Sequence, residues 1–108
     1  MASHIYLDDL RDPHTPLPWV VVRGRDELIA LVEREGFPEV VSLDHDLGED
    51  VPSGMDCARW LVEQGIARQI DPRTIEWNVH SANPVGAANI RGLYRSWIKF
   101  WEMEQGSR

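Results

Sequence analysis

The sequence predicts a single α/β domain built on a mostly parallel sheet of about four strands. The chain of 108 residues is long enough for one domain with one hydrophobic core. Short apolar segments alternate with segments of helical periodicity, in the order β, β, α, β, α, β, α. The first three apolar segments are almost continuously hydrophobic, which is typical of parallel strands covered on both faces.

Four segments are expected to form strands, and they cover residues 5–7, 19–22, 40–43 and 75–79. The fourth alternates between apolar and polar side chains, so we place it nearer an edge of the sheet. The segment between the first two strands contains three prolines and no helical pattern. Either an extended loop crosses over and keeps the second strand parallel, or the second strand is an antiparallel edge. We favour the extended crossover.

Three segments have the periodicity of helices, and they cover residues 26–35, 54–64 and 84 to about 104. Ser53 and Asp56 have the spacing of a capping box before the second helix, and Gly65 is expected to end that helix. Asn83 is a favourable N-cap residue for the third helix, and Pro84 suits its first position.

The composition restricts the compartment and the partners of the protein. The formal net charge of −7 disfavours binding to duplex DNA. Cys57 is the only cysteine, which excludes a disulfide within the chain and a four-cysteine zinc site. The sequence has no signal-peptide pattern and no apolar stretch of the roughly 20 residues needed to span a bilayer. We therefore expect a cytoplasmic protein with no membrane partner.

Polar residues follow three of the predicted strands directly. These residues are Asp8, Asp9, Asp44, His45, Asp46, His80, Ser81 and Asn83. Each group alone could be an ordinary turn or a helix cap. The carboxyl ends of parallel strands, however, lie at one edge of the sheet, where ligand sites of open α/β sheets are found. The coincidence at three strand ends predicts a metal-assisted phosphate site.

The residue types at these strand ends suggest their roles. Converging carboxylates repel one another unless a cation or a proton intervenes, and oxygen ligands suit a divalent metal, most readily Mg²⁺ or Mn²⁺. The candidate metal ligands are Asp8, Asp9, Asp44 and Asp46, although Asp46 could instead orient a histidine or cap the loop. The catalytic candidates are His45, His80 and Asp44, and the two histidines would share acid and base duty near neutral pH. Candidate phosphate contacts are Arg11, Ser81 and Asn83.

The last predicted helix carries two further patterns. Its wide apolar face consists of Leu93, Tyr94, Trp97, Ile98, Phe100 and Trp101. We interpret this face mainly as core packing, and an excess apolar patch could support a homodimer. Arg91, Arg95 and Lys99 recur at four-residue spacing. Such a stripe is most often a solvated face, and the alternative is a landing surface for an RNA strand.

The acidic pair and the lone aspartate resemble a response-regulator receiver domain. Asp8 and Asp9 match its metal-binding pair, Asp44 matches the phosphoacceptor position, Ser81 matches its hydroxyl position, and Gly54 resembles the glycine that opens the next helix. The departures are as informative as the matches. A receiver has a lysine after its fifth strand and a helix after its first strand. In this sequence the only lysine, Lys99, falls inside a predicted helix, and neither a fifth strand nor that first helix is evident. A true phosphoacceptor function is therefore disfavoured.

An ordinary receiver does not require His45 and His80. With these two histidines, the sequence resembles the cyclic-phosphate-processing receiver family of bacteria and phages. The segments that carry this resemblance are residues 7–11, 42–48 and 80–84, together with Gly86 and Asn89. The resemblance implies a reduced, receiver-like (flavodoxin-like) three-layer sandwich that opens cyclic phosphates, such as 2′,3′-cyclic phosphate RNA ends or related nucleotides. It also adds Asn89 to the substrate-binding candidates. The alternative is a non-catalytic module, derived from a receiver, that binds a nucleotide or takes part in signalling.

Overall fold

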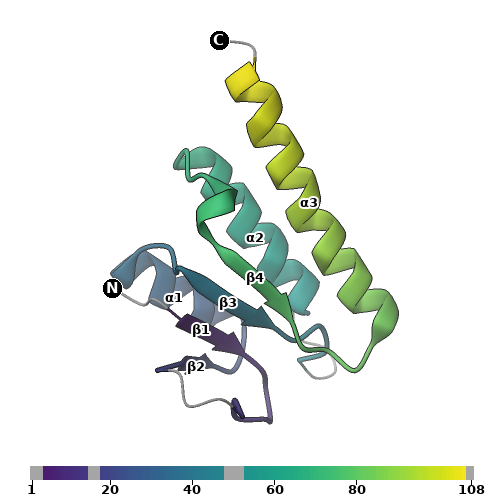
Figure 1. Cartoon of the computed structure of the whole chain (residues 1–108). Coiled ribbons are helices and arrows are strands. Elements are labelled where there is room, and N and C mark those ends of the chain that lie inside the picture. The colour runs from purple at the N-terminus through teal and green to yellow at the C-terminus, as the bar shows by residue number, and fades with distance from the viewer. Residues whose placement is uncertain (1–3, 15–17, 48–52, 107–108) are drawn as a thin grey trace.

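The computed structural model describes residues 4–14, 18–47 and 53–106. Its centre is a four-stranded sheet in the order β2-β1-β3-β4, and every neighbouring pair is parallel. The strands are β1 (His4–Leu7), β2 (Val20–Val22), β3 (Val40–Leu43) and β4 (Glu76–Val79). The parallel pairing of β1 with β2, which the favoured crossover requires, is confirmed, and β4 lies at an edge as its alternating pattern predicted (Figure 1). Residues 15–17 of the crossover lie outside the described residues.

The helices pack against one face of this sheet. They are α1 (Arg25–Glu35), α2 (Gly54–Ala67) and α3 (Pro84–Gly106), with a short 3₁₀ helix, η1 (Pro72–Thr74), before β4. In Figure 1, α1 and α2 lie behind the strands and α3 packs beside α2. Right-handed connections from β2 to β3 and from β3 to β4 step in the same direction, which places α1 and α2 on the same face. Between β1 and β2 the described residues contain no helix, so none covers the opposite face. The receiver-like fold is therefore present with one helical layer among the described residues, and the second helical layer of the expected three-layer sandwich is not seen there.

The core forms between the helices and alternate residues of the strands. Ile5, Leu7, Val41 and Leu43 point toward the helices, and none of them is more than 1 % exposed. Burial of each such side chain contributes roughly 1.5–3 kcal/mol. The central strands β1 and β3 are therefore firmly fixed, and so are the residues that directly follow them.

The start of α2 agrees with the sequence, and its end does not. Ser53 Oγ accepts a hydrogen bond from the Asp56 N–H at 3.3 Å, and Asp56 Oδ2 accepts one from the Ser53 N–H at 2.8 Å, so the capping box is confirmed. The prediction that Gly65 ends the helix is wrong, because the helix continues to Ala67. A Cβ atom at Gly65 would overlap the ring of Trp97. The glycine therefore allows close approach of α3 and does not terminate α2.

The apolar face of α3 is only partly used in the core. Trp97 is 2 % exposed, and Tyr94 stacks on Trp77 of β4 with ring centroids 4.9 Å apart. The core interpretation is confirmed for these residues. Phe100 is 37 % exposed and Met103 67 % exposed, so apolar surface remains near the end of the helix. A homodimer through this surface stays a prediction. Among the described residues, no helix is both long and apolar enough to cross a membrane.

Candidate active site

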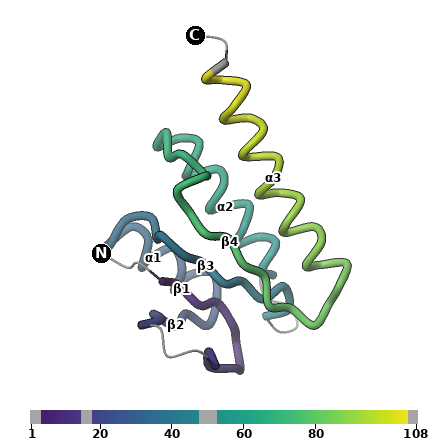
Figure 2. Tube along the Cα trace, in the orientation of Figure 1, coloured from purple at the N-terminus to yellow at the C-terminus, as the bar shows by residue number. Residues whose placement is uncertain are grey.

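Three predicted site residues occupy one row across the sheet. The last paired row of the central strands aligns Leu7 with Leu43 and Leu43 with Val79. The next residue along each of these strands is Asp8, Asp44 or His80. The sheet hydrogen bonds extend into this row, from the Asp44 N–H to the Leu7 carbonyl at 3.0 Å and from the His80 N–H to the Leu43 carbonyl at 3.0 Å. Figure 2 shows these chain segments meeting at one edge of the sheet.

Side-chain alternation then brings the three residues of this row together. Successive side chains of a strand point to opposite faces, so Asp8, Asp44 and His80 point away from the helices. Each offers one ligand atom, and these atoms all lie within 4.8 Å of one another. Asp8 is 2 % exposed, and the His80 side chain is 20 % exposed. We call these residues the Asp–Asp–His cluster.

Asp8 is held ionised by its hydrogen bonds. Burial alone would raise its pKa, but the backbone N–H groups of Arg11 and Leu10, together with His80, hold the pKa below its usual value. Oδ1 of Asp8 accepts from these two N–H groups at 2.8 and 2.9 Å. Oδ2 lies 3.1 Å from Nε2 of His80. The carboxylate is therefore fixed in both position and charge.

The pKa of Asp44 is shifted in the opposite direction to that of Asp8. Burial raises its pKa, and the negative charge of Asp8 raises it further. The His80 side chain and the backbone N–H groups of Asp46 and His45 compensate only in part. Two carboxylates at this separation repel each other, and a bound cation or proton relieves that repulsion.

His80 is oriented by two residues that sequence reasoning missed. Its Nδ1 lies 2.7 Å from the Ser42 hydroxyl, and its ring stacks on Tyr6 with centroids 4.3 Å apart and planes inclined by 8°. Because ionised Asp8 can only accept, the proton in their hydrogen bond belongs to Nε2, and neutral His80 accepts at Nδ1 from the hydroxyl. The signal for Ser42 was available, since it is the only polar residue within β3.

Arg23 is a third residue near the site that sequence reasoning missed. Its Nη1 donates to the carbonyl oxygens of Asp8 at 3.2 Å and of Arg11 at 2.8 Å, and its Nη2 donates to Asp12 Oδ1 at 2.7 Å. Arg23 follows β2 directly and so lies at the same sheet edge as the cluster. One guanidinium therefore ties together the loop that carries Asp8 and Arg11. An arginine directly after a strand was the available signal.

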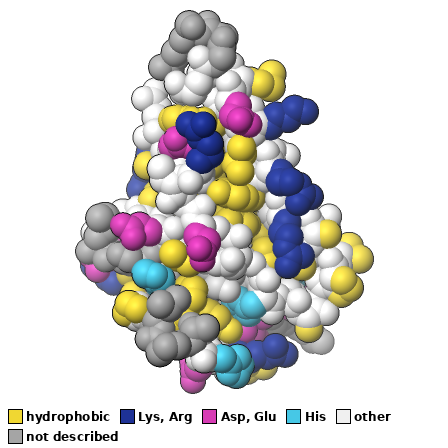
Figure 3. Space-filling view, viewed as in Figure 1, with side chains coloured by type: hydrophobic (Ala, Val, Ile, Leu, Met, Phe, Trp, Pro, Cys, Tyr) yellow, Lys and Arg dark blue, Asp and Glu magenta, His cyan; other side chains and the backbone are white. Residues whose placement is uncertain are grey.

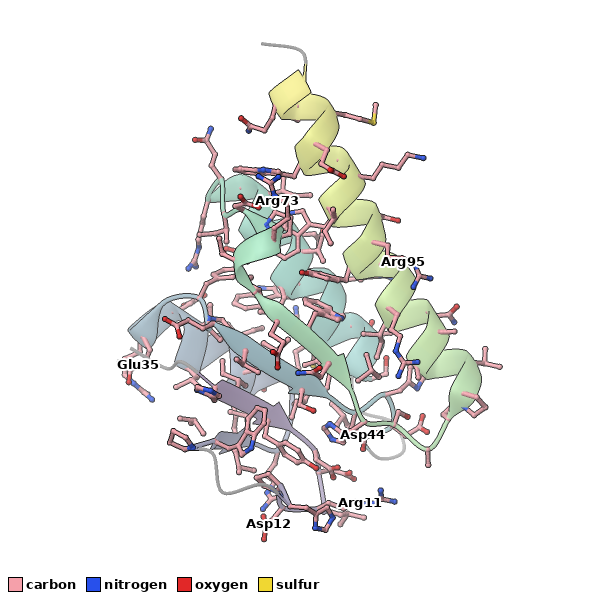
Figure 4. The ribbon with its side chains drawn as sticks, in the orientation of Figure 1. Arg11, Asp12, Glu35, Asp44, Arg73 and Arg95 are labelled. Atoms are coloured by element: carbon pink, nitrogen blue, oxygen red, sulfur yellow. The ribbon has the colours of Figure 1, made fainter. Side chains whose placement is uncertain are left out.

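The two carboxylates of the cluster, Asp8 and Asp44, border a hollow of about 300 Å³, whereas His80 is not among the residues that line it. The residues that line it are Asp8, Asp9, Leu10, Arg11, Asp44, Asp46 and Ala82. Two of the four predicted metal ligands, Asp9 and Asp46, thus lie at the hollow but outside the tight cluster. Arg11 is exposed, and Figure 4 shows it at the same end of the sheet as Asp44. The site joins carboxylates and a guanidinium around one opening.

His45 has surroundings different from those of His80. Its Nδ1 lies 2.8 Å from Asp46 Oδ1, and its side chain is 22 % exposed. The ring packs directly against Gly86 in the first turn of α3, where a Cβ atom would overlap it. The structure therefore places His45 beside the hollow's Asp46, and it does not place His45 within the Asp–Asp–His cluster.

The three uncharged residues predicted to contact substrate, Ser81, Asn83 and Asn89, lie at different distances from the hollow. Ser81 Oγ accepts from the Asn83 N–H at 3.1 Å, and Asn83 Oδ1 accepts from the Gly86 N–H at 3.0 Å, which confirms Asn83 as a helix cap. Both side chains shape the loop beside Ala82. Asn89 lies exposed on α3, about one turn beyond Gly86. Ser81 and Asn83 are thus near the hollow by their loop, whereas Asn89 lies farther along the helix.

Comparison with protein families gives a match over most of the chain. The matching family is described as the cyclic-phosphate processing receiver domain, and the match covers residues 3–96. The chain belongs to this family. No curated protein and no solved structure matches the chain.

This cyclic-phosphate processing receiver domain departs from an ordinary receiver as its sequence predicted. Among the described residues no strand follows β4, and Lys99 lies exposed on α3. Gly54 keeps a structural role: its N–H donates to the His45 carbonyl at 2.6 Å, and a Cβ atom there would overlap the Asp44 carbonyl. Gly48, at the end of the second family segment, lies outside the described residues.

Proposed function

We propose that this domain opens cyclic phosphates by metal-assisted hydrolysis, with 2′,3′-cyclic phosphate RNA ends or related nucleotides as substrates. The observation that carries the proposal is the Asp–Asp–His cluster, in which the fixed Asp8 carboxylate and the Asp44 carboxylate with its raised pKa line one hollow, and the oriented His80 imidazole lies close to both. Membership of the family supports the substrate class.

The donor set of the cluster fits a divalent cation. Asp8 and Asp44 would hold it, with Asp9 and Asp46 at the rim of the hollow as further oxygen donors. Oxygen donors of this kind suit Mg²⁺ or Mn²⁺. When bound, such a cation neutralises charge on the phosphoryl oxygens. The raised pKa of Asp44 supports the proposal, because a nearby positive charge would relieve its repulsion with Asp8.

His80 is proposed as the base that takes the proton of the attacking water. The water oxygen forms a bond to phosphorus, the bond from phosphorus to one ribose oxygen breaks, and that oxygen takes up a proton. The Ser42 hydroxyl accepts a hydrogen bond as readily as it donates one. In the structure Nε2 of His80 is engaged by Asp8 Oδ2, and it would become free to accept a proton from water only when that carboxylate oxygen binds a cation instead. The Ser42 hydroxyl would then accept from a protonated Nδ1.

His45 is proposed as the donor of a proton to the departing ribose oxygen. Asp46 holds its Nδ1, which leaves Nε2 as the atom that exchanges a proton. The exposed Arg11 is proposed to bind the phosphate, since a guanidinium matches two phosphoryl oxygens at once. Within the loop the Ser81 hydroxyl and the Asn83 amide oxygen accept hydrogen bonds, so the O–H of Ser81 and the N–H groups of the Asn83 amide are proposed to donate to phosphate.

A second candidate function is binding of a cyclic or linear nucleotide without turnover. It is favoured by one observation, namely that both ring nitrogens of His80 have hydrogen-bond partners within the protein. This alternative predicts stabilisation of the fold by ligand, by RT ln(1 + [L]/Kd), with no product.

Turnover of cyclic-phosphate substrates distinguishes the two functions. The substrates are the four 2′,3′-cyclic mononucleotides and a short RNA with a 2′,3′-cyclic phosphate end, each tested with Mg²⁺, Mn²⁺ and EDTA. Catalysis predicts a phosphomonoester product that His80→Ala abolishes. The matched control is His14→Ala, because His14 is exposed on the β1–β2 loop. Ligand-induced stabilisation with no product in any metal would instead support the binding module.

A further inference from the structure

The outer side of α3 carries a line of positive charge on an acidic protein. The chain has 18 acidic and 11 basic residues, yet from Pro84 to Trp101 it contains three basic residues and no acidic one. The three are Arg91, Arg95 and Lys99, and all of them are exposed. We call them the α3 basic stripe. Figure 3 shows Lys and Arg side chains in a line along this helix, on the same face of the molecule as histidine side chains.

The spacing of the stripe keeps its charges on one side of the helix. Residues four apart on an α helix are neighbours, about 6 Å apart along the axis. Within the described part of the chain, no carboxylate forms an ion pair with Arg95 or Lys99. Figure 4 shows Arg95 projecting away from the body of the protein. These two cations are therefore available to a ligand.

The stripe begins at the candidate active site. Arg91 Nη2 lies 3.4 Å from the carbonyl oxygen of Val79, the residue directly before His80. From there Arg95 and Lys99 lead away along the helix. A positive track that starts at a phosphate-binding centre fits a chain of further phosphates connected to the reacting one.

The helix surface beside the stripe carries only small side chains, so a nucleic-acid strand has room to lie against it. Ala88, Gly92 and Ser96 form a parallel row of small residues on the same helix. A Cβ atom added at Gly92 would meet only Arg95 Nη2, at 3.9 Å. A nucleic-acid backbone could thus approach the helix closely while its phosphates contact the neighbouring cations.

We infer that the α3 basic stripe binds the sugar–phosphate backbone of a single-stranded RNA whose cyclic-phosphate end occupies the site hollow. The inference rests on the proposed function and deepens it, because it selects RNA ends over free cyclic mononucleotides. The overall charge of −7 disfavours general nucleic-acid binding, so the attraction is confined to this track.

The test measures binding separately from turnover. A fluorescein-labelled ten-nucleotide RNA with a 3′-phosphate end is titrated with the wild type and with Arg95→Glu, by fluorescence anisotropy at several salt concentrations. Arg34→Glu is the matched control, because Arg34 is an exposed arginine on α1 and the change in net charge is the same. Circular dichroism confirms that each variant is folded, and Arg95→Lys tests rescue of the charge.

The expected result is a several-fold weaker Kd for Arg95→Glu, with the slope of log K against log [salt] reduced by about 0.7. Arg34→Glu and Arg95→Lys should bind nearly as tightly as the wild type. In turnover assays, Arg95→Glu should raise KM for the cyclic-phosphate RNA and leave KM for a cyclic mononucleotide unchanged.

Two results overturn the inference: no RNA binding by the wild type, or equal losses for Arg95→Glu and Arg34→Glu. Failure of the proposed function looks different. In that case the RNA binds through the stripe, but no cyclic phosphate of any kind is opened.

Discussion

Oδ2 of Asp8 lies 3.1 Å from Nε2 of His80, a contact between residues 72 positions apart in the chain. Asp8 follows β1 and His80 follows β4, and β3 lies between these strands in the sheet. The contact therefore spans the end of β3, where Asp44 lies. The cluster exists only when all three strands are assembled, so the chemistry of the site depends on the register of the sheet.

Ser42→Ala should lower kcat/KM by about 10- to 100-fold, the usual effect of removing a residue that orients a catalytic histidine. The hydroxyl lies 2.7 Å from Nδ1 of His80 and supports either tautomer. Steady-state kinetics on a cyclic mononucleotide measure the change. Ser42→Thr, which keeps the hydroxyl, should retain most of the activity. Equal activity of both variants and the wild type would show that this hydrogen bond has no positioning role.

Arg23→Ala should weaken Mn²⁺ binding by about 10-fold, because the loop that carries Asp8 and Arg11 loses three hydrogen bonds. Isothermal titration calorimetry with Mn²⁺ measures the affinity. Arg25→Ala is the control, since Arg25 lies two residues away in the first turn of α1 and lines a different hollow. An unchanged affinity for Arg23→Ala would contradict a role for this arginine in positioning the site.

Asp44→Asn should raise the melting temperature at neutral pH, measured in EDTA. The folded state raises the pKa of Asp44, through burial and then through Asp8, so ionisation of Asp44 opposes folding. Below the unfolded pKa of about 3.9 both states are protonated, and the difference between variant and wild type disappears. The gain should therefore appear as the pH rises through the raised folded pKa.

Asp56→Asn should have the opposite effect and lower the melting temperature at neutral pH. Its pKa is lowered mainly by the Ser53 backbone N–H of the capping box, so the carboxylate stabilises the fold at neutral pH. This stability is lost as the pH falls through the lowered folded pKa, and the variant should melt lower than the wild type only above that range. If Asp44→Asn lowered the melting temperature at pH 7 as Asp56→Asn does, the electrostatic account of Asp44 would be wrong.

Gly86→Ala and Gly92→Ala should have opposite effects on stability, although both lie within α3. Alanine in an exposed helix normally stabilises by about 1 kcal/mol relative to glycine, and Gly92 has room for a Cβ atom. At Gly86 the added atom would overlap the His45 ring, so that gain is lost and His45 must move. Urea unfolding measures the stability of both variants. Equal gains would show that His45 does not pack on the helix as described.

The sheet and the location of the site followed from the sequence because they depend on short-range patterns. Apolar strands that end in Asp8, Asp44 and His80 predicted a shared edge, and the parallel pairing places them in one row. The sequence did not separate Asp8 from Asp9, or Asp44 from His45. Register and alternation decide which member of each pair joins the cluster, and both depend on how the strands pair.

The remaining features depend on packing between distant segments. Glycine often ends a helix, so the sequence predicts an end at Gly65, whereas in the structure this glycine makes room for Trp97 of another helix. The sequence does not show the role of Arg23 because two of its three partners are backbone carbonyls, 12 and 15 positions earlier, and the third is the side chain of Asp12 in the same loop. Ser42 becomes informative only when His80 is known to lie beside it.

The most direct test of the account is ³¹P NMR of a 2′,3′-cyclic mononucleotide mixed with the wild-type domain and Mg²⁺ or Mn²⁺. Mn²⁺ is removed with EDTA before each spectrum, because it broadens phosphorus signals. The account predicts that the cyclic-phosphate resonance is replaced by a phosphomonoester resonance. The conversion should cease in EDTA and in the Asp8→Asn and His80→Ala variants, and it should persist in His14→Ala. An unchanged cyclic-phosphate resonance with either metal, or equal conversion by the wild type and His80→Ala, would contradict the assignment of the Asp–Asp–His cluster as the centre that opens cyclic phosphates.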